Sequence, residues 1–190
     1  MGGKLALFAV VGTLLIHVTG LSVTGLDPVA SPISALSRGS FAWYHTAGLL
    51  LFAGAHLALA IGLRTRVSGW LWQGGILLLI AGGCVLLYVA AFFVSAPAES
   101  LVGPHANDPL SVLASVIGVS MAALQRGLWR SSRPAGLFNL VCLIAWLLLI
   151  PLILLLEESW IGAYERLVGT IYLVWMGGLS LALPRLGNEQ

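Results

Sequence analysis

Long runs of apolar residues alternate with short polar stretches along the whole chain. There are six such runs, and each is close to the roughly 20 residues that an α-helix needs to cross the hydrocarbon core of a membrane. We therefore predict an all-α fold, a polytopic bundle of six transmembrane helices. The predicted helices cover about residues 5–24, 41–63, 68–94, 108–127, 136–156 and 160–184. No long polar insertion interrupts them, so residues 1–190 are predicted to form a single transmembrane domain.

The polar stretch at residues 27–45 separates the first two runs. Within it, Ser31 followed by Pro32 is typical of the cap and the first residue of a helix. Gly39 suits the position just after a helix. We therefore predict a short helix over about residues 32–38, lying in or on the membrane interface.

Basic and acidic residues fall on opposite sides of the predicted bundle. Seven of the nine basic residues lie in the predicted loops 64–67 and 126–135 or near the termini. Because cytoplasmic loops carry an excess of Lys and Arg, this side and both termini are predicted to be cytoplasmic. Six of the seven acidic residues lie on the other, outer side: Asp27, Glu99, Asp108, Glu157, Glu158 and Glu165. Two basic residues, Arg38 and Arg166, also lie there.

The overall composition agrees with a membrane protein. Of 190 residues, 59% are hydrophobic and 8% are charged, whereas a soluble domain carries about 25% charged residues. Lipids are therefore the expected partners of most of the surface. The net charge of +2, with no two basic residues adjacent, does not favour nucleic acid. Richness in Gly, Ala and Leu, and Arg in excess of Lys, point to a bacterial chain, so we expect a multi-pass protein of the cytoplasmic (inner) membrane.

Tryptophan and proline positions refine the predicted helices. Aromatic belts mark membrane interfaces, which places Trp43 and Trp160 at the outer interface and Trp70, Trp72 and Trp129 at the inner one. Pro151 is expected to kink the fifth helix near its outer end.

Polar side chains from three outer loops could form a cup that binds an amphiphile headgroup or a partner subunit. The candidate ligand-binding residues are Ser34, Arg38, Glu165 and Arg166, with His105 beside them. An unpaired charge at membrane depth costs about 2.5–3.5 kcal/mol. We therefore expect Arg166 to pair with Glu99 or Asp27, and Glu165 with Arg38. The simpler interpretation is that loops outside a membrane are polar without binding anything.

An alternative is a metal-dependent hydrolase acting on a lipid-like substrate at the outer leaflet. The candidate catalytic residues are His105, His45 and Glu99, and the candidate metal ligands are His45, His105 and Asp27. Histidine and carboxylate groups are ligands for divalent metals, and a bound metal can activate water. This hypothesis makes a divalent metal the cofactor, with Arg166 holding an anionic headgroup.

His17 and His56 raise the question of haem. Two haem ligands on neighbouring helices must lie at matching depths, but His17 lies about 18 Å from the inner end of its helix and His56 about 10 Å from the inner end of the next. The levels do not match, so haem is not favoured. We expect both histidines to form buried hydrogen bonds between helices.

Three polar motifs resemble a known family. The chain has Ile33-Ser34-Ala35-Leu36-Ser37-Arg38-Gly39 before a helix that ends in Gly62-Leu63-Arg64, then Phe92, Glu99 and His105 before the fourth helix, then Gly162-Ala163-Tyr164-Glu165-Arg166-Leu167 leading to Leu173-Val174-Trp175. In this order they resemble the domain-of-unknown-function 998 family of six-helix membrane proteins. The resemblance covers most of the chain. It implies the six-helix topology and no particular chemistry.

Overall fold

The computed structural model describes residues 2–37, 42–95 and 108–186, and the side chains among these outside 93–111. Within these ranges the chain is all-α, as predicted. The six long helices are α1 (Gly2–Thr24), α2 (Ala42–Arg64), α3 (Trp70–Ser95), α4 (Asp108–Ser131), α5 (Arg133–Leu149) and α6 (Ile161–Ala182). Short 3-10 turns are η1 (Ile33–Ser37), η5 (Ile150–Leu155), η6 (Glu158–Trp160) and η7 (Leu183–Arg185).

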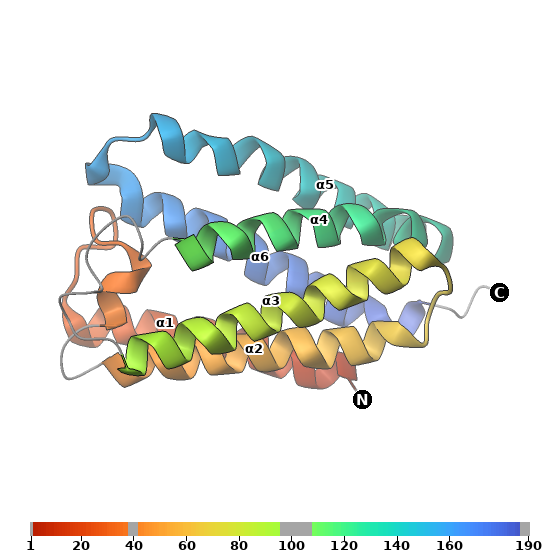
Figure 1. Ribbon diagram of the computed structural model, residues 1–190, viewed down its shortest axis with the longest axis horizontal. Coiled ribbons are helices and arrows are strands. Elements are labelled where there is room, and N and C mark those ends of the chain that lie inside the picture. The colour runs from red at the N-terminus through yellow and green to blue at the C-terminus, as the bar shows by residue number, and fades with distance from the viewer. Residues whose placement is uncertain (1, 38–41, 96–107, 187–190) are drawn as a thin grey trace.

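The six helices run antiparallel, side by side, in one elongated bundle (Figure 1). Each helix packs against the one before it, and α6 also packs against α1, which closes the bundle into a ring. Together with their 3-10 extensions, all six are long and apolar enough to cross a membrane. Large apolar side chains on their outward faces are exposed, among them Phe8, Ile61 and Leu154. Lipid rather than water would cover such a surface.

The six predicted helices are present, and some of their ends differ from the predicted ones. The predicted loop 126–135 is wrong, because α4 continues to Ser131 and α5 begins at Arg133. Long arginine side chains can keep their charge in water while the backbone remains helical. At Pro151 the helix type changes, since α5 ends at Leu149 and a 3-10 turn carries the proline, and the kink itself stays a prediction.

The short interfacial helix is present as the 3-10 turn η1, residues 33–37. Its predicted last residue, Arg38, lies outside the described residues.

The bundle core is apolar and includes one tryptophan that was predicted at the interface. Trp72 is 2% exposed. Its indole N–H donates to the carbonyl of Leu63 at 3.1 Å, and its ring packs where a side chain on Gly127 would stand. Trp72 is therefore a core residue, whereas Trp70, two residues earlier, is 82% exposed.

Two sets of polar side chains cross this core. His56 on α2 contacts the carbonyl of Phe52 through Nδ1 at 2.8 Å, and the hydroxyl of Tyr172 on α6 through Nε2. Because a carbonyl only accepts, Nδ1 carries the proton, and Nε2 of the neutral ring accepts from Tyr172. The predicted interhelical role of His56 is confirmed through Nε2, while Nδ1 bonds a carbonyl of its own helix.

The second set joins α4, α5 and α6 through Asn139. Its amide nitrogen donates to Gln125 Oε1 at 2.6 Å and to the carbonyl of Met121 at 2.9 Å. Its amide oxygen accepts from the indole of Trp175 at 2.7 Å. A buried polar group is costly unless it is hydrogen-bonded, and Asn139 uses donor and acceptor alike.

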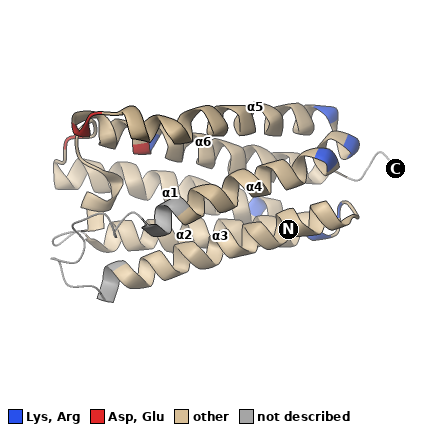
Figure 2. Cartoon of the chain, turned by 45° about the horizontal axis from the view of Figure 1, so that its top comes forward, with Lys and Arg blue, Asp and Glu red and all other residues tan. Residues whose placement is uncertain are grey.

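Charge separates along the long axis of the bundle (Figure 2). One end, here called the basic end, carries Lys4, Arg64, Arg66, Arg126, Arg130, Arg133 and Arg185. The opposite, acidic end carries Asp27, Glu157, Glu158 and Glu165. Arg166 lies with the acids, which makes it the cation that needs explanation.

Candidate functional site at the acidic end

Residues 25–37, here called the outer loop, leave α1 and fold onto the beginning of α6. Gly25 closes α1 with a φ of 64°, a left-handed conformation that glycine adopts readily. The carboxylate of Asp27 then accepts from the backbone N–H groups of Val29 at 2.7 Å and Ala30 at 3.4 Å. Such a bond from an Asp side chain to the next residues is a common turn device. Asp27 thus shapes the loop.

Glu165 on α6 fastens the outer loop at η1. Its carboxylate accepts from the backbone N–H of Ile33 at 2.5 Å. Nearby, the backbone N–H of Ala163 donates to the carbonyl of Val29 at 2.9 Å. Both bonds use groups in the first turns of α6, so the loop is joined to the helix end rather than to its middle.

The close approach of the two segments requires a glycine at position 162. A Cβ atom there would collide with the carbonyl oxygens of Ser31 and Val29. Gly162 is buried beneath these carbonyls. The loop backbone therefore rests directly on the helix backbone.

Arg166 completes the contact through one of its terminal nitrogens. Nη1 donates to the carbonyls of Ser31 at 2.7 Å, Pro28 at 2.9 Å and Gly162 at 2.9 Å. The other two nitrogens, Nε and Nη2, are buried and have no hydrogen-bond partner in the part of the chain that the structure describes. One side of the guanidinium thus holds the loop, and the other side is unused.

Two histidines lie below the loop, on α1 and α2. His17 interacts electrostatically with Arg166, and His45 with His17. From the acidic ends of their helices these three residues lie about 10, 5 and 8 Å deep, in the order His17, His45, Arg166. The ring nitrogen Nε2 of His17 is buried without a hydrogen-bond partner among the described residues.

The structure brings together part of the predicted site. Glu165 and Arg166 lie side by side on α6 and both hold the outer loop, which also carries the half-buried Ser34. Asp27 is exposed on the same loop, and His45 lies at the start of α2. Arg38, Glu99 and His105 lie outside the described residues. The predicted pairs of Glu165 with Arg38 and of Arg166 with Glu99 therefore stay predictions.

The predicted pair of Arg166 with Asp27 takes a different form. The two groups interact electrostatically, but Arg166 donates to loop carbonyls, and Asp27 accepts from loop N–H groups. Arg166 therefore contacts the backbone of the loop rather than the carboxylate of Asp27.

Within residues 2–37, 42–95 and 108–186 no three His, Cys, Asp or Glu side chains are grouped as metal ligands would be. The predicted ligand His105 is not in these ranges, so a divalent metal at His45, His105 and Asp27 stays a prediction.

His17 is the residue of this site that the sequence analysis placed elsewhere. It was expected to form a buried hydrogen bond between helices, but its Nε2 has no hydrogen-bond partner among the described residues. The available signal was its depth from the acidic end of the bundle. His17 lies seven residues from Thr24, and Arg166 lies five residues from Ile161, so the two depths are similar.

A family model described as "Protein of unknown function (DUF998)" matches residues 6–182. Searches of curated proteins and of solved structures gave no match.

Proposed function

The chain belongs to the DUF998 family, whose description assigns no activity, and we propose that its acidic end binds the anionic headgroup of a membrane amphiphile. The headgroup, a phosphate or a carboxylate, would lie below the outer loop between α1 and α6. Arg166 and His17 would contact it, and Glu165 would position the loop that covers it.

The observation that carries this proposal is the unused side of Arg166. Its Nε and Nη2 are buried without a partner in the described ranges. Buried polar atoms of side chains are nearly always hydrogen-bonded, and an unsatisfied donor costs about 1–3 kcal/mol, more when it is charged. A bound anion would satisfy both donors at once.

The chemistry of these two atoms selects the type of ligand. Nε and Nη2 form one edge of the planar guanidinium, with two parallel N–H bonds. This edge matches two oxygens of one carboxylate or phosphate, and such bidentate pairs are both strong and geometrically specific. Nε2 of His17, also buried and unpaired among the described atoms, supplies another polar contact from a different helix.

Access to this position depends on the outer loop. Among the described residues, hydrogen bonds from or to Ala163, Glu165 and Arg166 hold the loop to α6. A typical hydrogen bond contributes only about 0.5–1.5 kcal/mol net, and up to about 3 when one group is charged. We expect the loop to lift when a headgroup enters, so a disulfide between the loop and α6 would prevent binding.

Titration with dodecyl phosphate in an uncharged detergent tests the proposal. The Arg126→Gln/Arg130→Gln background is used, so that these two exposed arginines of the basic end do not contribute. Arg166→Lys keeps the charge but loses the bidentate edge, and His17→Asn leaves the hydrogen bonds between the loop and α6 intact. Each should weaken binding about tenfold, which corresponds to about 1.4 kcal/mol.

The matched control is Arg64→Gln, which removes an exposed arginine at the other end of the bundle. Its affinity for dodecyl phosphate should be unchanged. Equal affinity in the Arg166→Lys, His17→Asn and unsubstituted proteins would overturn the proposal.

A further inference from the structure

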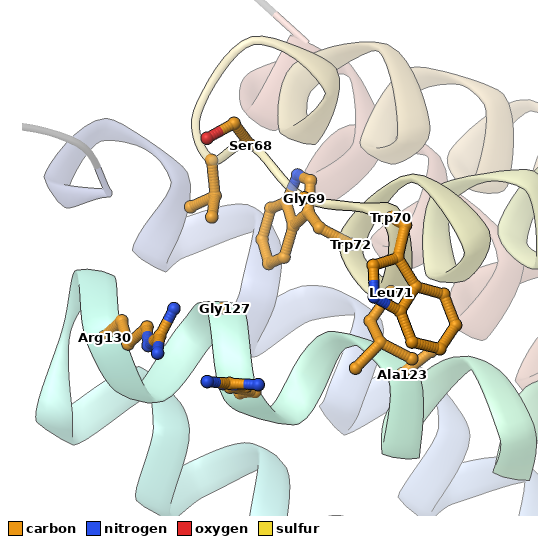
Figure 3. Close-up of a pocket in the computed structure, with 10 residues that line it drawn as sticks. Ser68, Gly69, Trp70, Leu71, Trp72, Ala123, Gly127 and Arg130 are labelled. Carbon is orange, nitrogen blue, oxygen red and sulfur yellow. The ribbon is translucent and has the colours of Figure 1, made fainter.

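A cavity of about 190 Å³ lies at the basic end, between the beginning of α3 and the last turns of α4. Figure 3 shows Trp70, Leu71 and Trp72 on one side and Ala123, Gly127 and Arg130 on the other. Arg126, Ser68 and Val67 complete most of its lining. This cavity is separate from the site at the acidic end, because it lies at the opposite end of the helices.

Its two arginines have no hydrogen-bond or ion-pair partner among the described residues. Arg126 and Arg130 are one helical turn apart on α4, so they lie on the same face. Both are exposed, and neither makes a hydrogen bond or ion pair to any residue within the described ranges. By contrast, Arg66 donates to the carbonyl of Leu186 at 3.2 Å, and Arg133 stacks over the ring of Trp129 at 5.2 Å. The cavity is thus lined by two basic side chains that make no hydrogen bond or ion pair with the described residues.

The rest of the cavity suits an anion at a membrane surface. The first turn of α3 has N–H groups that no residue of the helix can accept. The helix dipole adds partial positive charge at that position. The space next to Gly69 is open, with no atom within 4 Å of where a Cβ would stand. Trp70 is 82% exposed beside it, as expected for a tryptophan at the headgroup level.

We infer that this cavity binds the phosphate of an anionic phospholipid from the leaflet at the basic end. Arg126 and Arg130 would hold the phosphate, and the acyl chains would lie outside, along the exposed apolar surface of α3 and α4. The size agrees, because 190 Å³ is below the roughly 300–1,000 Å³ of a pocket that encloses a drug-sized molecule. It would take a headgroup and leave the chains in the membrane.

A lipid fits better than a free anion because of the walls. Half of the lining residues have apolar or aromatic side chains: Val67, Trp70, Leu71, Trp72 and Ala123. The same two arginines also border a more open depression of about 570 Å³ on the other side of α4, with Trp129 and Leu140. Basic pockets between membrane helices on the positively charged side are typical headgroup sites.

The test compares lipid vesicles and inorganic phosphate as probes. The full chain is reconstituted in phosphatidylcholine, with and without phosphatidylglycerol, and bound lipid is counted by native mass spectrometry. We expect retained phosphatidylglycerol in the unsubstituted protein. Arg126→Gln/Arg130→Gln should reduce it at least tenfold. Arg64→Gln/Arg133→Gln, which removes two arginines of the same end outside the cavity, should reduce it less than twofold.

Equal losses in the two double variants would mean that only the total charge matters, and would overturn the inference. The inference would also be overturned if inorganic phosphate, in an uncharged detergent, bound as tightly as phosphatidylglycerol, because the cavity would then select a free anion. Circular dichroism of both variants should match the unsubstituted protein, since Arg126 and Arg130 make no hydrogen bond or ion pair within the described ranges and Arg133 makes only the stacking contact with Trp129.

Discussion

The carboxylate of Glu165 accepts a hydrogen bond from the backbone N–H of Ile33, which is 132 residues earlier in the chain, at an N···O distance of 2.5 Å. The bond ties the loop after α1 to the beginning of α6, next to the place where these two helices close the ring. It therefore holds the outer loop over the acidic end. The bond also gives the carboxylate of Glu165 the partner that a charge at membrane depth needs.

Replacing Glu165 should release this cover. In Glu165→Leu the N–H of Ile33 loses its acceptor, and we expect amide hydrogens of residues 29–35 to exchange about tenfold faster, which corresponds to about 1.4 kcal/mol. In Glu165→Gln the amide oxygen can still accept, so the increase should be smaller. Hydrogen exchange with mass spectrometry measures both. Glu158→Gln, an exposed acid at the same end, is the control, and a response like that of Glu165→Leu would contradict the assigned role.

Gly162 should tolerate no side chain. A Cβ there meets the carbonyls of Ser31 and Val29, and overpacking costs about 1–3 kcal/mol. Gly162→Ala is expected to lower the thermal unfolding temperature in detergent. Gly169→Ala on the same helix has its nearest neighbour, a methyl carbon of Ile33, at 3.9 Å. This control should be neutral or stabilising, because alanine favours a helix over glycine by up to about 1 kcal/mol. Equal effects of the two changes would show that the loop does not rest on α6.

The hydroxyl of Tyr172 should contribute to stability through His56. Tyr172→Phe removes the donor and leaves Nε2 of a fully buried histidine without a partner. Stranding a buried polar atom costs about 1–3 kcal/mol. Denaturation in mixed micelles should therefore show a loss of that order. Tyr88→Phe, at a side chain that is 62% exposed, should show none, and a loss as large in Tyr88→Phe would assign the effect to aromatic packing in general.

The sequence was sufficient for the helices because their signal is composition over about 20 residues. It was insufficient for the turn between α4 and α5, where Arg126, Arg130 and Arg133 were interpreted as a loop. Charged residues at a helix end indicate where the membrane stops, but the backbone can continue as a helix into the interface. The prediction that Trp72 lies at the interface was wrong for a similar reason, since an aromatic residue near a helix end can face lipid or the core.

The contacts at the acidic end were predicted only in part. The cost of an unpaired charge correctly indicated that Glu165 and Arg166 need partners across loops. Both found backbone groups of the outer loop, which are present at every residue and leave no mark in the pattern of side chains. His17 was separated from Arg166 by 149 positions in sequence, and only the closure of α6 onto α1 brings the two together.

The orientation of the bundle in the membrane is the remaining prediction from charge. Loops with an excess of Lys and Arg stay in the cytoplasm, so the basic end and the two termini should face it. Single cysteines at Lys4 and Arg185, and at Asp27 and Glu158, can be introduced in a Cys84→Ser/Cys142→Ser background. A membrane-impermeant maleimide applied to intact cells should label the second pair and not the first, and inverted vesicles should reverse the result. Labelling of Lys4→Cys from outside the cell would contradict the charge rule, and would mean that the bundle is inserted the other way, with the acidic end, Arg166 and the outer loop in the cytoplasm.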